Sequence, residues 1–148
     1  ILHGAEIVLP VFDSLRVRLV DGAGEVFGPD DVLVARVGLT EWQMIDDFDG
    51  DGRTDAVVAG WSSGGGSGTF VELMHFVLRG DENSDFVWVW SGAVPLGDRV
   101  QVRGLSTTDR GIEAQLTVHG TEDPLCCPTV DVVRQYEISD GILREGGR

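Results

Sequence analysis

Hydrophobic and polar residues alternate along much of this chain, which is typical of β-strands with one buried face. The clearest example is the segment 111–119, in which isoleucine, alanine, leucine and valine occupy every second position. The segment 99–103 alternates in the same way, and turn-forming residues at 106–111 separate the two runs. The pattern therefore predicts a β-hairpin here.

Seven further segments combine apolar or alternating residues with flanking turn residues, and each is predicted to form a strand. They are 15–20, 32–37, 56–61, 70–78, 86–90, 129–138 and 142–144. The sequences DGAG at 21–24 and SDG at 139–141 predict tight turns. Helical periodicity is scarce, and the alternative of a short helix rests on Pro29, which two aspartates follow.

About nine or ten short strands at spacings near ten residues predict an all-β fold. We expect a single antiparallel β-sandwich or barrel-like domain over residues 1–148. The chain has 148 residues, of which 42% are hydrophobic, and this is enough to bury a core without the help of metals or disulfides.

The charge of the chain excludes several classes of partner. It has 25 acidic residues against 11 basic ones, a net charge of −14, and every basic residue is an arginine. Phosphate backbones would be repelled, so no nucleic-acid partner is expected. No apolar run approaches the roughly 18 residues of a membrane span, so no transmembrane segment is expected, while a signal peptide or lipid anchor can lie upstream of Ile1.

Candidate chemistry begins with the segment DFDGDGRTD at 47–55. Ca²⁺ takes six to eight oxygen ligands, and a short loop wraps it when side chains at alternate positions turn inward. We predict a calcium site whose ligands are Asp47, Asp49, Asp51, the backbone carbonyl of Arg53, and Asp55. Four carboxylates this close together would repel one another without a cation.

The loop is not an EF-hand. The twelfth position, which would need a bidentate glutamate, is Val58, and a strand-like apolar run follows. The pattern DxDxDGxxD instead resembles the calcium loops of FG-GAP and integrin-type β-propeller blades. Because it occurs once, a complete propeller is not expected. Likeness to extracellular modules implies a dissociation constant on the order of 10⁻⁴ to 10⁻³ M, which external calcium would satisfy and cytosolic calcium would not.

Cys126 and Cys127 are the only cysteines, and they are adjacent in the segment DPLCCP. Consecutive Cα atoms lie about 3.8 Å apart, below the usual disulfide range of roughly 4.4 to 6.8 Å, so a disulfide between them would be strained and reducible. It would close almost no loop, which leaves a rigid turn or a redox role as its purpose. The alternatives are two free thiols, or a Cu(I) or Zn²⁺ site completed by His119.

Several segments together resemble a recurring pattern in uncharacterised bacterial secreted proteins and lipoproteins. They are the acidic segment 47–56, GGSGTF at 65–70, PLGDRV at 95–100, HG at 119–120, DPLCCPT at 123–129 and RQY at 134–136. The resemblance covers roughly residues 45 to 144. It implies an extracytoplasmic bacterial domain, whether secreted, periplasmic or lipid-anchored. It transfers no catalytic residue.

These observations favour a calcium-stabilised binding domain over an enzyme, with a protein or a carbohydrate as its ligand. One alternative is a secreted hydrolase in which His119 and carboxylates share a pocket. Another is a thiol/disulfide redox or copper-handling protein that uses Cys126 and Cys127.

Two further features are interpreted as parts of the core. Phe86, Trp88 and Trp90 share one strand face, for which a sugar-stacking platform is the alternative. His75 lies among apolar strand residues and is expected to be a core histidine with a hydrogen-bond partner.

Overall fold

The computed structural model describes residues 5–9, 15–64, 66, 68–81, 83–109 and 111–146, and within these residues it contains strands and no helix. The predicted all-β class is confirmed. The strands are β1 (Glu6–Leu9), β2 (Leu15–Arg18), β3 (Ala23–Phe27), β4 (Leu33–Asp46), β5 (Asp55–Ser63), β6 (Phe70–Asp81), β7 (Ser84–Asp98), β8 (Gln101–Thr108), β9 (Gly111–Val118), β10 (Val130–Ser139) and β11 (Ile142–Glu145).

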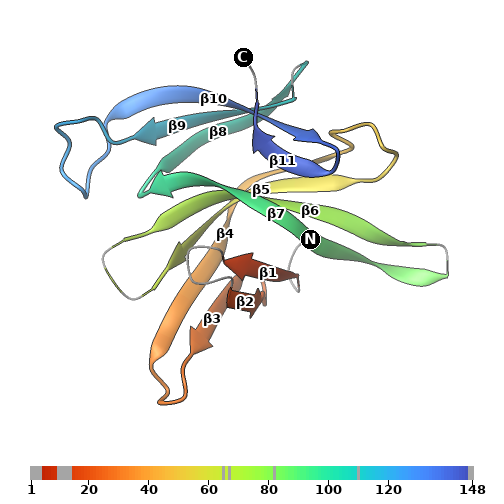
Figure 1. Cartoon of the computed structure of the whole chain (residues 1–148), viewed down its shortest axis with the longest axis horizontal. Coiled ribbons are helices and arrows are strands. Elements are labelled where there is room, and N and C mark those ends of the chain that lie inside the picture. Colours follow the sequence, from red (N-terminus) through yellow and green to blue (C-terminus); the bar gives the residue numbers. More distant parts are fainter. Residues whose placement is uncertain are drawn as a thin grey trace.

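The strands form three antiparallel sheets. The largest has five strands in the order β3-β4-β5-β6-β7, the second has four in the order β11-β10-β9-β8, and β1 pairs with β2. The five-stranded sheet curls like half of a barrel, with the four-stranded sheet over one face and the β1–β2 pair against the other (Figure 1). The fold is therefore sandwich-like and is not a closed propeller.

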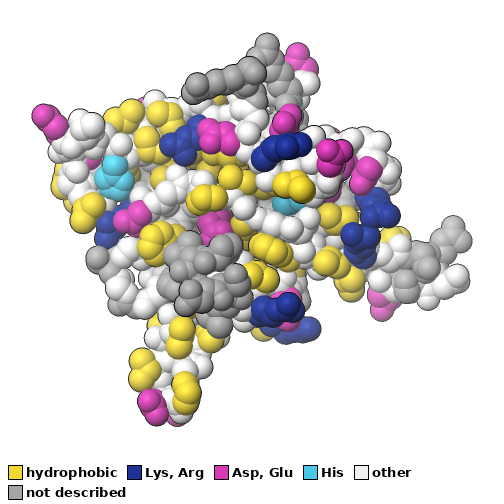
Figure 2. Space-filling view, viewed as in Figure 1, with side chains coloured by type: hydrophobic (Ala, Val, Ile, Leu, Met, Phe, Trp, Pro, Cys, Tyr) yellow, Lys and Arg dark blue, Asp and Glu magenta, His cyan; other side chains and the backbone are white. Residues whose placement is uncertain are grey.

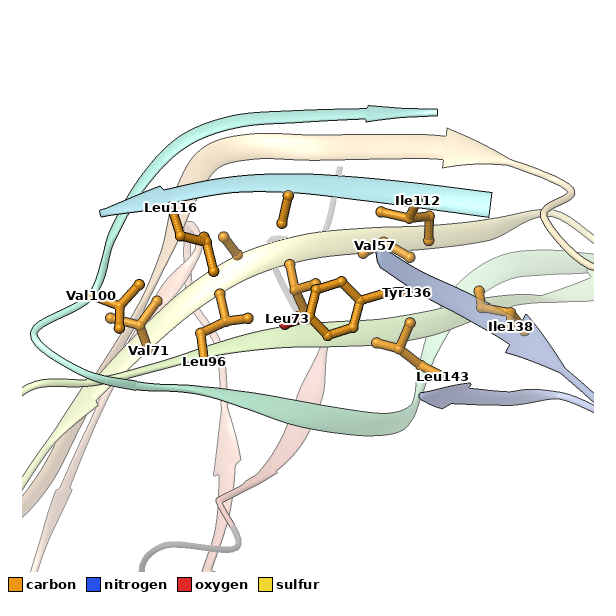
Figure 3. Close-up of a cluster of buried hydrophobic side chains, with 12 residues drawn as sticks. Val57, Val71, Leu73, Leu96, Val100, Ile112, Leu116, Tyr136, Ile138 and Leu143 are labelled. Atoms are coloured by element: carbon orange, nitrogen blue, oxygen red, sulfur yellow. The ribbon is translucent and has the colours of Figure 1, made fainter. Parts of the chain in front are cut away.

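Two hydrophobic cores lie on opposite faces of the five-stranded sheet. The upper core, between this sheet and the four-stranded sheet, includes Val57, Leu73 and Tyr136 (Figure 3). The lower core includes Val58 and Phe76 and is covered by the β1–β2 pair. Because successive residues of a strand face opposite sides, β5 supplies side chains to both cores and is almost completely buried.

A wide bulge bends β4 in its middle. Leu39 pairs with Gly60 and Gln43 pairs with Val58, so the three residues between Leu39 and Gln43 on β4 face a single residue of β5. The hydroxyl of Thr40 stabilises this bulge, because it donates to the backbone carbonyl of Ala59 on β5 at 2.8 Å. The two extra residues shift β4 along β5 without changing the face that odd and even positions present, since Ala35, Val37 and Leu39 pack on the lower core and Trp42 and Met44 on the upper core.

Tight turns form at both places where the sequence predicts them. The turn at 140–141 closes the β10–β11 hairpin, while the turn at 21–22 is closed by a single bridge between Val20 and Ala23, because β2 and β3 belong to different sheets. Asp21 and Gly22 both have positive φ, at 53° and 80°, and Asp140 and Gly141 repeat this at 54° and 76°. Such paired left-handed residues fit the right-handed twist of adjoining strands. Both turns were predicted from aspartate followed by glycine, but the first does not lead to a paired hairpin.

The short helix at Pro29 is wrong. The chain there makes a turn, in which Gly28 N–H donates to the carbonyl of Val32 at 2.8 Å and Asp31 has a φ of +57°. A left-handed residue two positions after the proline ends any helical run. The turn joins β3 to β4 and leaves Phe27 and Val32 exposed on a protruding hairpin, where Figure 2 shows hydrophobic side chains.

Candidate metal site

The acidic loop connects β4 to β5 at one end of the five-stranded sheet. Asp47, Asp49 and Asp55 each place one carboxylate oxygen within 4.8 Å of the oxygens of the other two. Asp47 and Asp55 stand at the two ends of the segment 47–55, so the loop folds back on itself to bring them together. The three carboxylates form a group that can hold a metal ion.

Backbone N–H groups hold the Asp47 carboxylate in place. Its Oδ1 accepts from Gly50 N–H at 3.0 Å and its Oδ2 accepts from Gly52 N–H at 2.9 Å. The Gly52 hydrogen bond is the main reason that the pKa of Asp47 is lowered. Both glycines have positive φ, at 73° and 86°, which is why this loop needs glycine at both positions.

The surroundings of Asp49 disfavour its charged form when no cation is bound. Burial is the main cause that raises the pKa of Asp49, and the negative charges of Asp55 and Asp51 raise it further. Hydrogen bonding opposes this in part, because the Asp49 Oδ1 accepts from Asp51 N–H at 3.3 Å. A bound cation would remove the conflict between these carboxylates.

Asp55 anchors the group in the upper core. It is 2% exposed, and its Oδ2 accepts from Phe48 N–H at 3.2 Å. Its Oδ1 lies 2.8 Å from Nε2 of His75, which is 1% exposed. A carboxylate only accepts, so Nε2 carries the proton and donates. His75 Nδ1 has no hydrogen-bond partner among the described residues, so the expected core histidine is satisfied at one of its two nitrogens.

His75 belongs to this site, and the sequence pattern did not reveal it. The register of β5 and β6 pairs Asp55 with Val77 and Val57 with His75, which makes Asp55 and His75 diagonal neighbours on one face. Twenty residues separate the two side chains in sequence. The sequence around His75 shows only a histidine among apolar strand residues, and this pattern does not indicate that it contacts the acidic loop.

Asp51 and Arg53 lie in the same loop but outside the three-carboxylate group. The Asp51 carboxylate accepts from Arg53 N–H at 2.8 Å. Their places as metal ligands stay predictions. The donor set within the group consists of carboxylate oxygens alone, which suits hard cations such as Ca²⁺, Mg²⁺ or Mn²⁺.

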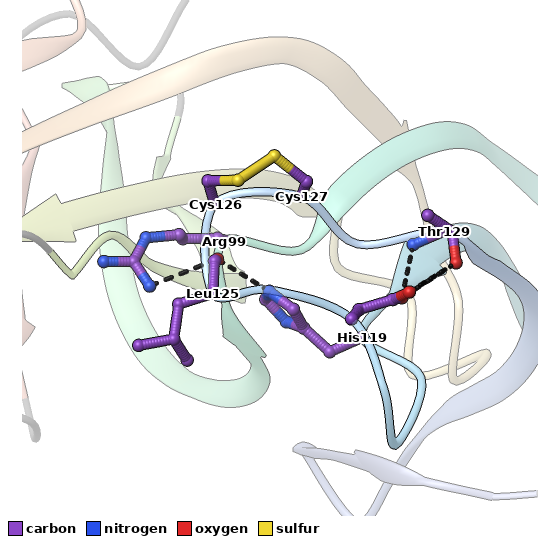
Figure 4. Close-up of a disulfide and its surroundings, with 7 residues drawn as sticks. Arg99, His119, Leu125, Cys126, Cys127 and Thr129 are labelled. Atoms are coloured by element: carbon purple, nitrogen blue, oxygen red, sulfur yellow. Dashed lines mark hydrogen bonds between the residues drawn. A yellow bond between two sulfur atoms is a disulfide. The ribbon is translucent and has the colours of Figure 1, made fainter.

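The two cysteines form a disulfide in the loop between β9 and β10. Their Cα atoms are 3.7 Å apart, and neither thiol is free. The adjoining carbonyl of Leu125 accepts from Arg99 Nη1 at 3.2 Å and from His119 Nε2 at 2.7 Å (Figure 4). The His119 ring therefore points to a backbone carbonyl, and in this oxidised form the sulfurs are bonded to each other.

Asp123 closes the same loop. Its Oδ2 accepts from Gly120 N–H at 2.7 Å and from Thr129 N–H at 2.9 Å, and the Thr129 hydroxyl adds a bond of 2.8 Å. The Gly120 hydrogen bond is the first cause that lowers the pKa of Asp123. These contacts join the two ends of the loop independently of the disulfide.

The other residues that the sequence singled out, the aromatic strand face and His119, have different surroundings. Trp88 and Trp90 pack against the lower core, as predicted, while Phe86 is 63% exposed and does not belong to it. The residues that line the three principal grooves of the described part of the chain do not include His119. Among the described residues no helix has the length and apolar character that a membrane crossing requires.

Comparisons with protein-family models, with curated proteins and with solved structures found no match to this chain. The resemblance to bacterial secreted proteins stays a prediction. The chemistry of the molecule must therefore be inferred from its own residues.

Proposed function

We propose that this protein is an extracytoplasmic binding domain stabilised by a calcium ion in the segment 47–55. The observation that carries the proposal is the convergence of Asp47, Asp49 and Asp55, whose carboxylate oxygens lie within 4.8 Å of one another. Loop hydrogen bonds fix the first two, and the His75 pair fixes the third. Carboxylates held this close favour a divalent cation over mutual repulsion.

Calcium fits this loop better than the other hard cations. Ca²⁺ accepts irregular geometry and high coordination numbers, so the loop's carbonyls and water can complete its shell, while Mg²⁺ demands a near-ideal octahedron. The loop joins two neighbouring strands of the sheet that both cores share. An ion here would therefore hold β4 and β5 together at their connection.

One expectation and one observation support a location outside the cytoplasm. If the loop binds calcium as extracellular modules do, its dissociation constant is on the order of 10⁻⁴ to 10⁻³ M, a range that cytosolic calcium does not reach. The Cys126–Cys127 disulfide also belongs to an oxidising compartment, since cytosolic thiols are kept reduced.

No specific observation favours the two alternatives, a hydrolase that uses His119 and a redox or copper-handling protein that uses the two cysteines. The His119 ring is engaged by the carbonyl of Leu125. The cysteine sulfurs offer no thiolate until they are reduced. A binding role agrees better with a molecule whose acidic groups gather in a structural loop.

The proposal is tested by thermal unfolding with EDTA and with about 5 mM CaCl₂. Calcium should raise the melting midpoint by roughly 2 to 8 °C, because binding to the folded state alone adds about 1 to 2 kcal/mol at that concentration. Asp49→Ala should lose this rise. Asp30→Ala, the same change in an exposed turn, should keep it.

Isothermal titration with Ca²⁺ and with Mg²⁺ distinguishes the ion. A rise that MgCl₂ reproduces in full would mean that the site is a general divalent one. A midpoint that CaCl₂ leaves unchanged, in protein shown to be metal-free by elemental analysis, would overturn the calcium proposal.

A further inference from the structure

A groove outside the metal loop lies between the five-stranded sheet and β8. Its volume is about 670 Å³, within the range of small-molecule sites. Its lining includes Trp42 and Trp61, which we call its walls, and the buried residues Val71 and Val100. It also includes the exposed residues Glu41 and Arg103, which we call its polar rim. We call this the tryptophan groove. Both indole rings are half-buried, so each offers part of its surface to a ligand.

The absence of a side chain at Gly38 leaves space for the Trp61 ring. Gly38 pairs with Trp61 across β4 and β5. A Cβ on Gly38 would lie only 2.6 to 2.7 Å from atoms of the indole. The ring therefore packs directly against the β4 backbone, where any larger residue would displace it.

The β4 bulge places the second wall. Trp42 N–H donates to the Thr40 hydroxyl at 3.1 Å, and that hydroxyl donates to the Ala59 carbonyl at 2.8 Å. The two extra residues of the bulge shift Trp42 along β5 and leave it on the face opposite Leu39. Trp42 and Trp61 both pack against the upper core.

Hydrogen bonds within the four-stranded sheet fix Arg103 of the polar rim. Arg103 Nε donates to Thr117 Oγ1 at 3.2 Å, and its Nη2 donates to the side-chain carbonyl of Gln101. Thr117 in turn donates to Asp131 at 2.7 Å. These bonds fix the guanidinium beside Thr117 and Gln101, and Arg103 also lines the groove, so its remaining N–H groups can serve a ligand.

We propose that the tryptophan groove binds a neutral oligosaccharide. A sugar ring has a flat C–H face, which packs on an aromatic ring, and a rim of hydroxyls, which pair with groups such as Glu41 and Arg103. One acidic and one basic group leave the rim without a net charge, while the protein's charge of −14 disfavours anionic ligands.

An extended peptide is the less suitable occupant. A peptide would add to the free edge of β8, the outer strand of its sheet. A register shift between Val102 and Gly104 interrupts that edge where it borders the groove. The assignment to a saccharide rests on the proposed function, because it names the ligand class of the binding domain.

The test is isothermal titration of the calcium-loaded protein with neutral hexasaccharides of β-glucose, α-glucose, xylose, mannose and N-acetylglucosamine. At least one should bind. Trp42→Ala and Trp61→Ala should each weaken that binding by about tenfold or more, as expected for central aromatic contacts. Phe86→Ala, which removes an exposed aromatic ring elsewhere, should leave it unchanged.

Gly38→Ala gives a second test that keeps both tryptophans. Its added methyl group collides with the Trp61 ring, so binding should weaken while the protein, checked by circular dichroism, stays folded. The inference is overturned if none of the five hexasaccharides binds at about 5 mM, a weaker affinity than sites of this kind need. It is also overturned if both tryptophan variants bind as the native protein does.

Thermal melts on the same samples separate this inference from the calcium proposal. A calcium-dependent midpoint without saccharide binding removes only the saccharide assignment. Saccharide binding without a calcium-dependent midpoint removes only the calcium proposal.

Discussion

The pairing of Asp55 with His75 shows how single residues connect the acidic loop to the core. A charged carboxylate that is 2% exposed needs hydrogen-bond donors, because its burial in an apolar surrounding is costly. His75 Nε2 and Phe48 N–H supply two of them. They also fix the direction in which Asp55 faces its neighbours, as partners of metal-ligating carboxylates do.

Replacing His75 tests this connection. His75→Phe leaves Asp55 short of one donor, so we expect a loss of about 1 to 3 kcal/mol of unfolding free energy in urea titrations. Calcium affinity, measured by titration calorimetry, should fall by about 10-fold or more. His75→Gln keeps a donor and should lose less in both. Unchanged calcium affinity in His75→Phe would show that the pair is structural only.

Glu72 predicts a pH dependence of stability. It is 2% exposed, its Oε1 has no hydrogen-bond partner among the described residues, and burial raises its pKa above the ordinary value of 4.5. The folded protein therefore holds this proton more tightly than the unfolded chain does. The stability that it contributes is complete below the unfolded pKa and is lost as pH rises through the folded pKa.

Glu72→Gln removes the titrating group. From about pH 5 to about pH 8, the unfolding free energy of this variant should decline less than that of the native protein, as measured by urea unfolding at each pH. Glu122→Gln, the same change at an exposed position, should follow the native curve. Identical slopes for all three proteins would contradict the assignment to Glu72.

Among the elements, β4 shows most clearly what alternation can predict. Its first half alternates and was predicted as 32–37, but the strand continues to Asp46. The buried apolar residues of its first half, Ala35, Val37 and Leu39, face the lower core, while those of its second half, Trp42 and Met44, face the upper core. The apolar positions therefore change from odd to even along one strand, and a single alternating pattern does not cover both halves.

The Thr40 hydroxyl should be important for this strand. Thr40→Val keeps the shape of the side chain and removes both hydrogen bonds, which leaves Trp42 N–H and the Ala59 carbonyl without that partner. We expect a loss of about 1 to 2 kcal/mol in urea unfolding. Thr107→Val, at an exposed position of β8, should cost much less. Equal costs would mean that the bulge does not depend on the hydroxyl.

β7 repeats the lesson of β4. Only 86–90 of its range Ser84–Asp98 was predicted, because Gly92, Pro95 and Gly97 read as strand breakers. Register shifts against β6 accommodate these residues. In contrast, β9 and β10 pair without a shift, and their predicted ranges agree with the structure to within a residue.

The candidate metal site and the tryptophan groove likewise contain residues that the sequence could predict and residues that it could not. The aspartate spacing predicted that Asp47, Asp49 and Asp55 meet, since that depends on a short loop alone. The contributions of His75 and Gly38 depend on strand register, which alternation does not specify.

The loop between β9 and β10 gives a prediction about redox conditions. A disulfide between adjacent residues restricts the unfolded chain very little, so its reduction should cost less than about 1 kcal/mol. Asp123 still joins the two ends of the loop through Gly120 and Thr129. Thermal melts with and without a phosphine reductant should nearly coincide. A large drop in the midpoint would show that the disulfide supports the wider fold.

For the whole molecule, the five-stranded sheet is the common wall of two cores. β5 at its centre is buried on both faces, while the acidic loop at its start is the part that a cation would order. Stability should therefore vary along the chain, with the loop opening at lower cost than the central strands.

Hydrogen exchange can measure this difference. Removal of calcium should speed amide exchange in residues 47–55 and at the adjoining ends of β4 and β5, while the middle of β6 stays protected. The control is sodium chloride at matched ionic strength, because screening alone relieves the repulsion of a chain with a charge of −14. Uniformly faster exchange throughout would place calcium's effect on global unfolding instead.

The composition of the acidic loop also affects how readily proteases cleave the protein. The chain contains no lysine, so trypsin-like enzymes can cut it only after arginine, and exposed Arg53 lies in the middle of this loop. A cut there would separate β4 from β5, neighbouring strands of the central sheet. An ion that keeps the loop closed would shield that bond. Calcium in the surroundings would then slow tryptic cleavage at this bond.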